Sequence, residues 1–261
     1  MGDKRTAPGL IRFKSKQQKI VTLTCYDFTS AQIAEAAGID VILVGDSLGN
    51  VIQGHGTTLP VTLEDICYHV ACVAPAVENC LLVADMPFGT YNSSVAQAVD
   101  SAVELMRAGA GAVKLEGLYL DEIRAIHKAG IPVMGHAGLT PQSVHNFGGF
   151  KVQGKGDHAE KLLEACKEIE EAGAFSIVLE LVETEIATRI SRELVIPTIG
   201  IGAGSGCDGQ VQVWHDLLGL NESIFKHAKP FVQGRELFVE GIRQYISEVK
   251  SGEFPGKENS F

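Results

Sequence analysis

The chain has 261 residues, of which 45% are hydrophobic and 21% are charged, and it carries a formal net charge of −10. This length and composition are typical of a globular protein with one large core, such as a single α/β barrel. The acidic balance argues against a general surface for nucleic acid or for an anionic membrane, but it is compatible with a small anionic substrate held by a local metal ion or lysine.

Eight short segments rich in β-forming residues follow one another along the chain. We predict strands over residues 20–27, 41–47, 80–86, 112–117, 132–138, 176–181, 197–203 and 210–214. Several of these segments are apolar almost throughout instead of alternating, as expected of strands that are covered on both faces.

Helical patterns lie between most of the predicted strands. Residues 30–40 reach a stop at Gly38, and Thr62 with Asp65 predicts a capping box at the start of residues 62–77. Further helices are predicted over residues 93–111, 157–174 and 234–252. Strand, helix and strand in repetition require right-handed crossovers and a parallel sheet.

Eight such units in a chain of this length favour closure into a barrel over an open doubly wound sheet. We therefore predict an α/β fold, a single (β/α)8 TIM barrel with an additional C-terminal helix. No linker or composition change marks a second domain. The prediction is one domain over residues 1–261, with a core over about residues 20–234 and frayed termini.

The six cysteines form no CxxC pair, and most of them lie in apolar runs. We expect buried, reduced thiols in a cytosolic protein in preference to a disulfide framework or a zinc site. The basic N-terminal segment has no apolar run of the kind found in secretory signals, and no apolar run reaches transmembrane length.

Acidic or histidine side chains stand at or near the carboxyl end of six predicted strands. They are Asp27, Asp46, Asp85, Glu116, His136 and Glu180. Any one of them alone would most simply cap the following helix, but in a parallel barrel all these ends meet at one mouth. Carboxylates packed together repel one another and are costly to desolvate unless a cation or protons join them. Oxygen ligands favour magnesium, or else manganese or calcium, over zinc.

Two side chains near these acids leave alternatives open. Lys114 is two residues from Glu116, so both side chains face the same side of the strand. Lys114 makes either an internal ion pair or a cationic contact to a substrate carboxylate. For His136, the role of a satisfied polar residue of the barrel interior is favoured over that of a metal ligand.

The longest irregular segment, residues 139–156, is either a functional lid or a disordered loop.

Six motifs occur in a set order between about residue 20 and about residue 234. They are VGDSLG, LLVADMPF, VKLEG, GHAGLTPQSV, FGGFKVQGKG and IGIGAGSGCDGQV. The ordered set resembles ketopantoate hydroxymethyltransferase, also called 3-methyl-2-oxobutanoate hydroxymethyltransferase. This resemblance implies a magnesium-dependent enzyme of the phosphoenolpyruvate/pyruvate barrel superfamily.

Such an enzyme transfers a hydroxymethyl group from 5,10-methylenetetrahydrofolate to 3-methyl-2-oxobutanoate (alpha-ketoisovalerate), by way of a magnesium-stabilised enolate. The product is 2-dehydropantoate (ketopantoate), in the first step toward pantothenate and coenzyme A. The resemblance also implies a cytoplasmic homo-oligomer, commonly a decamer built as a pentamer of dimers. Its partners would be the keto acid and folate, without nucleic acid or membrane.

The resemblance assigns roles to the residues that match the motifs. Magnesium would be bound by Asp46 and Asp85, with Glu116 completing its surroundings. The keto acid would be held by Asp46, Ser47, Asp85 and Lys114. The catalytic acid/base would be Glu180.

The chain departs from the family pattern directly after this glutamate. The family often continues with a small residue, valine and proline, whereas this chain continues Leu-Val-Glu-Thr-Glu. Glu183 or Glu185 is therefore an alternative base. We prefer Glu180 because it ends the apolar run in register with the other strand-end acids.

Two other functions stay open at this stage. The first is a carbon–carbon or carbon–phosphorus lyase of the same superfamily, although such lyases usually carry a Lys-Lys-Cys-Gly-His type of loop, which residues 139–156 lack. The second is a barrel retained as a binding or scaffold protein, which predicts the loss of some strand-end acids. A folate requirement would separate the transferase from the lyase, and magnesium-linked keto-acid binding would argue against the scaffold.

Overall fold

A computed structural model describes residues 4–147, 149, 151–223 and 225–261 of the chain. Contacts divide the chain into two compact units, Met1–Val213 and Trp214–Phe261, and each is described by itself. The single domain expected over residues 1–261 stays a prediction.

The first unit is a closed barrel of eight parallel strands in which each strand pairs with the next and β8 pairs with β1. The strands are β1 (Ile20–Thr24), β2 (Val41–Val44), β3 (Leu81–Asp85), β4 (Ala112–Lys114), β5 (Val133–Gly138), β6 (Ser176–Glu180), β7 (Thr198–Ile201) and β8 (Gly209–Gln212). Every predicted strand corresponds to one of them. The predicted (β/α)8 barrel with an added C-terminal helix is confirmed.

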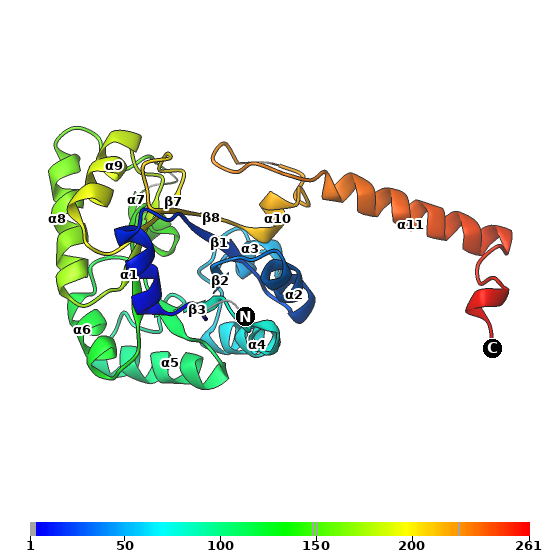
Figure 1. The fold of residues 1–261 in the computed structure, drawn as a ribbon, viewed down its shortest axis with the longest axis horizontal. Coiled ribbons are helices and arrows are strands. Elements are labelled where there is room, and N and C mark those ends of the chain that lie inside the picture. The colour runs from blue at the N-terminus through cyan, green and yellow to red at the C-terminus, as the bar shows by residue number, and fades with distance from the viewer. Residues whose placement is uncertain (1–3, 148, 150, 224) are drawn as a thin grey trace. The chain divides into compact units, whose positions relative to one another are not determined.

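Helices surround the barrel (Figure 1). Those of the first unit are α1 (Ala7–Ser15), α2 (Phe28–Ala36), α3 (Leu48–Val51), α4 (Leu63–Val73), α5 (Val95–Ala108), α6 (Leu120–Lys128), α7 (Val144–Phe147), α8 (His158–Glu171) and α9 (Thr184–Glu193). Short 3-10 helices are η1 (Ala74–Ala76) and η2 (Pro141–Ser143). The capping box expected at the start of α4 is present, with Thr62 and Asp65 each bonding the other's backbone. In this part of the chain, α1, α3, α6, α7 and α9 were not among the predicted helices.

Helix α1 closes the amino-terminal end of the barrel. Its Ala7 and Leu10 belong to one buried apolar cluster with Ile20, Val41 and Leu81, which are the first residues of their strands. The helix begins with Thr6 as its cap, and the Thr6 hydroxyl accepts a hydrogen bond from a backbone N–H of the first turn. The barrel interior is therefore dry at this end, and polar chemistry is confined to the opposite end.

On several strands the inward-facing side chains change from apolar to polar toward the carboxyl end of the strand. The inward pairs are Val83 and Asp85 on β3, Ala112 and Lys114 on β4, Met134 and His136 on β5, and Val178 and Glu180 on β6, where the first of each pair belongs to the apolar cluster. Because side chains two residues apart share one face of a strand, the polar member lies directly above the core. We call this carboxyl end of the barrel the mouth.

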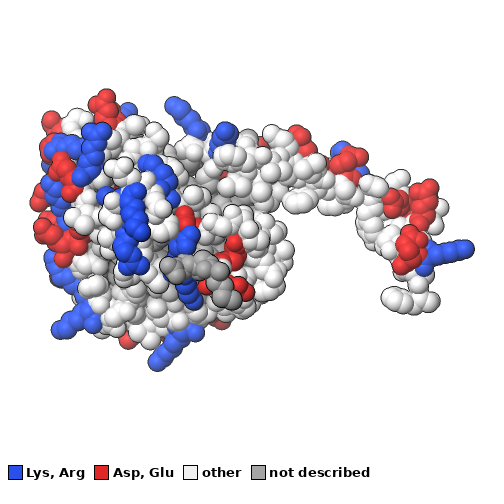
Figure 2. Space-filling view, in the orientation of Figure 1, with Lys and Arg blue, Asp and Glu red and all other residues white. Residues whose placement is uncertain are grey.

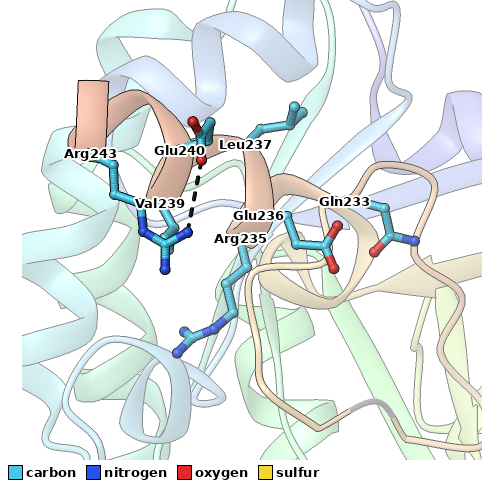
Figure 3. A pocket seen from close by; sticks show the side chains of 7 residues that line it. All are labelled: Gln233, Arg235, Glu236, Leu237, Val239, Glu240 and Arg243. Atoms are coloured by element: carbon cyan, nitrogen blue, oxygen red, sulfur yellow. Dashed lines mark ion pairs between the residues drawn. The ribbon is translucent and has the colours of Figure 1, made fainter. Parts of the chain in front are cut away.

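The second unit contains α10 (Trp214–Leu217), α11 (Gly234–Ser251) and a 3-10 helix, η3 (Lys257–Asn259). A hollow runs along the first turns of α11, between Gln233 and Arg243 (Figure 3). All of its lining side chains are exposed, and they carry charges of both signs, among them the ion pair of Glu240 with Arg243. We assign no site to this hollow.

Charged side chains of both signs are interspersed over the face of the first unit seen in Figure 2. In the described part of the chain, no helix combines the length and the apolar character that crossing a membrane requires.

Candidate active site

Asp85 and Lys114 form the centre of the polar cluster at the mouth. The two residues are paired across β3 and β4, and Lys114 Nζ lies 2.5 Å from Asp85 Oδ1. The other oxygen, Asp85 Oδ2, accepts the backbone N–H of Asp46 at 3.0 Å. Both side chains are buried, so the ion pair is screened little by water. Three neighbouring strands are thus joined through one carboxylate.

Gly45 makes the approach of Asp85 to the backbone possible. A Cβ atom at this position would lie 2.9 Å from Ser47 Oγ and 3.3 Å from Asp85 Oδ2. A side chain here would therefore displace the carboxylate from the N–H group that it accepts. The glycine of the VGDSLG motif is explained by this close approach.

Glu116, His136 and Glu180 form a second row of charged side chains at the mouth. His136 Nδ1 lies 3.2 Å from Glu116 Oε1, and His136 Nε2 lies 3.4 Å from Glu180 Oε2. Both distances are those of ion pairs, but neither ring N–H is aligned well enough with an oxygen for a hydrogen bond. His136 therefore interacts with the two glutamates through charge and not through hydrogen bonds. It is a polar residue of the barrel interior, as expected, but its ring nitrogens have no hydrogen-bond partner among the described residues. Lys114 Nζ is 3.9 Å from Glu116 Oε1, so the Asp85–Lys114 ion pair lies next to the row that contains His136.

The charges of the mouth shift the pKa values of its members. Burial, then the charges of Asp85 and Glu116, raise the pKa of Asp46 to about 8. Burial opposes the charge of Lys114, but the surrounding carboxylates outweigh it and raise its pKa. Burial likewise opposes ionisation of Glu116, yet His136, followed by Lys114, lowers its pKa overall.

Gln142 is a member of the mouth that sequence reasoning missed. It lies on η2, is only 5% exposed, and its Nε2 donates to Asp46 Oδ2 at 2.9 Å. Its backbone N–H donates to Glu116 Oε2 at 3.0 Å. Tyr91 was also missed, and its hydroxyl donates to Gln142 Oε1 at 2.5 Å. Only the position of Gln142 inside the GLTPQSV motif could have drawn attention to it.

Ser47 directly follows Asp46, and its hydroxyl lies 2.8 Å from the hydroxyl of Tyr26. Tyr26 is buried, and desolvation raises its pKa, so it stays protonated. A tyrosine that the sequence did not single out thus holds the serine hydroxyl in place.

Asp27 is the strand-end acid that does not join the cluster, and the prediction for this residue was wrong. Its Oδ1 accepts the backbone N–H of Ser30 at 2.9 Å, and it caps α2 in a reciprocal capping box. The residue is exposed. Local capping of the next helix satisfies this carboxylate.

Glu180 is the acid of the mouth that is partly open, with 16% of its side chain exposed. The following Leu181 has a φ of +46°, in the left-handed region that a leucine rarely adopts, and its N–H donates to the carbonyl of Ile201. The chain therefore turns away directly after Glu180. Glu183 and Glu185 are exposed at the start of α9, which places Glu180 alone of the three beside His136.

The donor set fits a divalent cation. The acids of the mouth are Asp46, Asp85, Glu116 and Glu180, and the bases are Lys114 and His136. The surplus of negative charge that raises the pKa of Asp46 is what a cation would neutralise. Within the described ranges, no three His, Cys, Asp or Glu side chains are arranged to hold a metal by themselves. Asp46 and Asp85 fit the pattern in which one or two carboxylates bind magnesium together with water and substrate.

His136 is expected to make the metal-free protein less stable as the pH rises. Burial alone would lower its pKa, but Glu116 and Glu180 outweigh burial and raise it from 6.5 to about 9. The folded state therefore binds this proton more tightly than the unfolded chain does, and its stabilising contribution is full below pH 6.5 and lost as the pH passes about 9. The raised pKa of Asp46 acts in the same direction.

Thermal unfolding in EDTA should thus show a Tm that falls by several degrees across this pH interval. His136→Asn should flatten the dependence, because the coupling to the two glutamates is removed. An unchanged slope in the variant would contradict the assignment.

A closed parallel barrel with buried acids, a lysine and a histidine at the carboxyl ends of its strands is a (β/α)8-barrel enzyme, because active sites of that fold lie at this end. The comparisons with known proteins narrow this class. The chain belongs to the ketopantoate hydroxymethyltransferase family, whose model matches residues 4–257.

Two curated relatives align with nearly the whole of this chain. A 3-methyl-2-oxobutanoate hydroxymethyltransferase of Burkholderia multivorans is 52% identical over 260 residues, covering 98% of this chain and 96% of the relative. The enzyme of the same name from Aeropyrum pernix is 49% identical over 261 residues, covering 99% and 95%. The resemblance seen in the motifs is confirmed, and the chain is an enzyme of this family.

Solved structures of other barrels share the fold. Phosphonopyruvate hydrolase, in a complex with oxalate and Mg++, superposes with a TM-score of 0.63 at 12% identity, covering 97% of this chain and 93% of that one. The 2,3-dimethylmalate lyase, a member of the PEP mutase/isocitrate lyase superfamily, gives a TM-score of 0.63 at 19% identity and covers 98% and 92%. These likenesses show the barrel fold.

Proposed function

We propose that this enzyme transfers a hydroxymethyl group from 5,10-methylenetetrahydrofolate to 3-methyl-2-oxobutanoate and forms 2-dehydropantoate with the help of magnesium. The single observation that carries the proposal is the buried cluster in which Asp46, Asp85 and Lys114 meet beside Glu180 and His136. The names of the relatives supply the keto acid and the transferred group.

Asp46 and Asp85 would hold the magnesium ion through their carboxylates. When bound, the ion would withdraw electron density from the keto oxygen of the substrate and make the neighbouring C–H group more acidic. Oxalate is a small dianion with the same pair of adjacent oxygens as a 2-oxo acid, and it accompanies Mg++ in the phosphonopyruvate hydrolase structure. This parallel supports a keto acid at the mouth here.

Glu180 would remove the proton from the carbon next to the ketone. Its carboxylate is partly exposed at the mouth and lies against His136, so it is open to a substrate bound there. The raised pKa of Lys114 keeps its cation intact beside Asp85, where it can stabilise negative charge that develops on the substrate. Water would hydrolyse the methylene bridge of the folate to tetrahydrofolate and formaldehyde. The carbanion would then attack the formaldehyde carbon, and the resulting alkoxide would take up the proton that Glu180 had removed, which gives the hydroxymethyl group of the product.

Ser47 would orient the substrate carboxylate. Ser47→Ala removes the hydroxyl and should lower kcat/KM for the keto acid about 10-fold to 100-fold, since a hydrogen bond to a charged group contributes about 1.5 to 3 kcal/mol. Most of the loss should appear in KM, measured by initial rates at saturating folate. Tyr26→Phe removes the hydroxyl that bonds Ser47 and Thr24 but leaves the Ser47 hydroxyl in place, so it should have a smaller effect; the reverse order would contradict a direct contact of Ser47 with substrate.

The defining experiment is turnover of the purified protein with both substrates, with and without magnesium. Product formation that requires the folate and is abolished by EDTA would support the proposal. Cleavage of an oxaloacetate-like or phosphonopyruvate-like substrate without folate would instead favour the lyase alternative, and absence of any keto-acid binding would favour a scaffold.

Assembly into a homodecamer is a further part of the proposal. Light scattering after gel filtration should give a mass ten times that of the 27.9 kDa chain. A monomer that turns over at full rate would separate the catalytic proposal from the proposed assembly.

A further inference from the structure

Gln142 bonds partners at the mouth through both ends of its side-chain amide and through its backbone N–H. Its Nε2 donates to Asp46 Oδ2 at 2.9 Å and to the backbone carbonyl of Met86 at 3.1 Å. Its Oε1 accepts from the hydroxyl of Tyr91, and its backbone N–H donates to Glu116 Oε2. One residue of the segment after β5 therefore touches groups that follow β2, β3 and β4.

The orientation of the Gln142 amide follows from its partners. The carbonyl of Met86 can only accept, so it must face the nitrogen, and the hydroxyl of Tyr91 donates to the oxygen. A flipped amide would set its oxygen against both a carbonyl and a carboxylate. The donor that faces Asp46 is thus determined by the surrounding structure.

This donor engages one oxygen of the Asp46 carboxylate and not the other. Asp46 Oδ2 accepts from Gln142, whereas Oδ1 has no hydrogen-bond donor among the residues that the structure describes. A carboxylate held through one oxygen cannot rotate freely, and its second oxygen points in a defined direction.

We propose that Gln142 is a positioning residue that presents the free oxygen of Asp46 to the divalent cation, an inference that rests on the proposed function. The contact also ties η2 to the carboxylate that would bind the cation. Partners that orient a metal ligand commonly change metal affinity by about 10-fold to 100-fold when they are removed.

The test uses Gln142→Met, which keeps the length of the side chain and removes both the donor and the acceptor. Its matched control is Gln97→Met on α5. The Gln97 amide makes the same kind of bonds, to the carbonyl of Gly89 and the hydroxyl of Ser93, but has no carboxylate partner among the described residues. The dissociation constant of Mg²⁺ alone is measured by calorimetry on the full chain, without turnover, and a crystal structure of each variant reports the Asp46 rotamer.

We expect Gln142→Met to weaken Mg²⁺ binding about 10-fold or more, with Asp46 rotated or in more than one rotamer, and Gln97→Met to match the wild type. Folded Gln142→Met with wild-type affinity and an unmoved Asp46 would overturn the inference. If Gln142→Met does not fold, Tyr91→Phe removes the donor to Oε1, together with the longer contacts of that hydroxyl to the backbone of Glu116. It should rotate Asp46 and weaken Mg²⁺ binding by a smaller factor; unchanged affinity in that variant would overturn the inference too. Wild-type protein that binds no Mg²⁺ would contradict the proposed function and this inference together.

Discussion

Asp85→Asn is expected to lower kcat/KM by about three orders of magnitude or more while leaving the barrel folded. The substitution keeps the shape of the side chain but removes a charge that contacts Lys114 Nζ at 2.5 Å and accepts the N–H of Asp46. A metal ligand that polarises a carbonyl contributes several kcal/mol to the transition state, and each 1.4 kcal/mol is about a factor of ten. Initial rates across a magnesium titration measure the effect.

Asp27→Asn is the matched control for Asp85. Asp85 is the last residue of β3, whereas Asp27 follows β1 by three residues, caps α2 and lies outside the cluster. Because asparagine also caps helices well, the control should retain its stability and its full activity. Circular dichroism confirms folding of both variants. Metal-dependent turnover at the wild-type rate in Asp85→Asn would rule out the proposed role of this carboxylate.

Glu180→Gln is expected to bind the keto acid but to lose exchange of its carbon-bound proton with deuterated water. A glutamine cannot accept that proton, and loss of a general base commonly costs about 10²-fold to 10⁴-fold in rate. The amide still fits beside His136, so the geometry around it is conserved. Proton NMR of 3-methyl-2-oxobutanoate in deuterated water, with enzyme and magnesium but no folate, follows the exchange directly.

Glu183→Gln serves as the control, because Glu183 is exposed at the start of α9. It should exchange the proton at the wild-type rate. If instead Glu180→Gln exchanges normally and Glu183→Gln does not, the base must be reassigned. The sequence alone left these glutamates as alternatives, and in the structure Glu180 is the one that contacts His136.

The local pattern predicted most of the barrel because barrel strands are buried on both faces. The segment of β2 is apolar at every position, so both of its faces must be buried. A closed barrel covered by helices buries eight such segments together. Seven of the eight strands end earlier than predicted, and β5 ends at the predicted Gly138. Asp46 and Glu116 each lie two residues beyond the paired part of a strand, where the backbone has already turned toward the mouth.

Asp27 illustrates where local reasoning failed. Nothing in the strand itself distinguishes Asp27 from Asp85, but Ser30 stands three residues after Asp27 and completes a capping box with it. Asp85 instead has a lysine opposite it on the neighbouring strand. The competition between a helix cap and a long-range ion pair decides the role of each carboxylate.

By itself the sequence determined the order of eight buried strands, the barrel that closes them and the placement of acids, Lys114 and His136 at one end, because each of these depends on short-range periodicity. Only the tertiary structure decided that Gln142, 96 residues from Asp46 in the chain, donates to its carboxylate, and that Tyr26 and Tyr91 support the site. Such contacts have no period in the sequence: they exist because barrel closure brings the ends of distant strands together, and burial there favours polar groups that bond to one another.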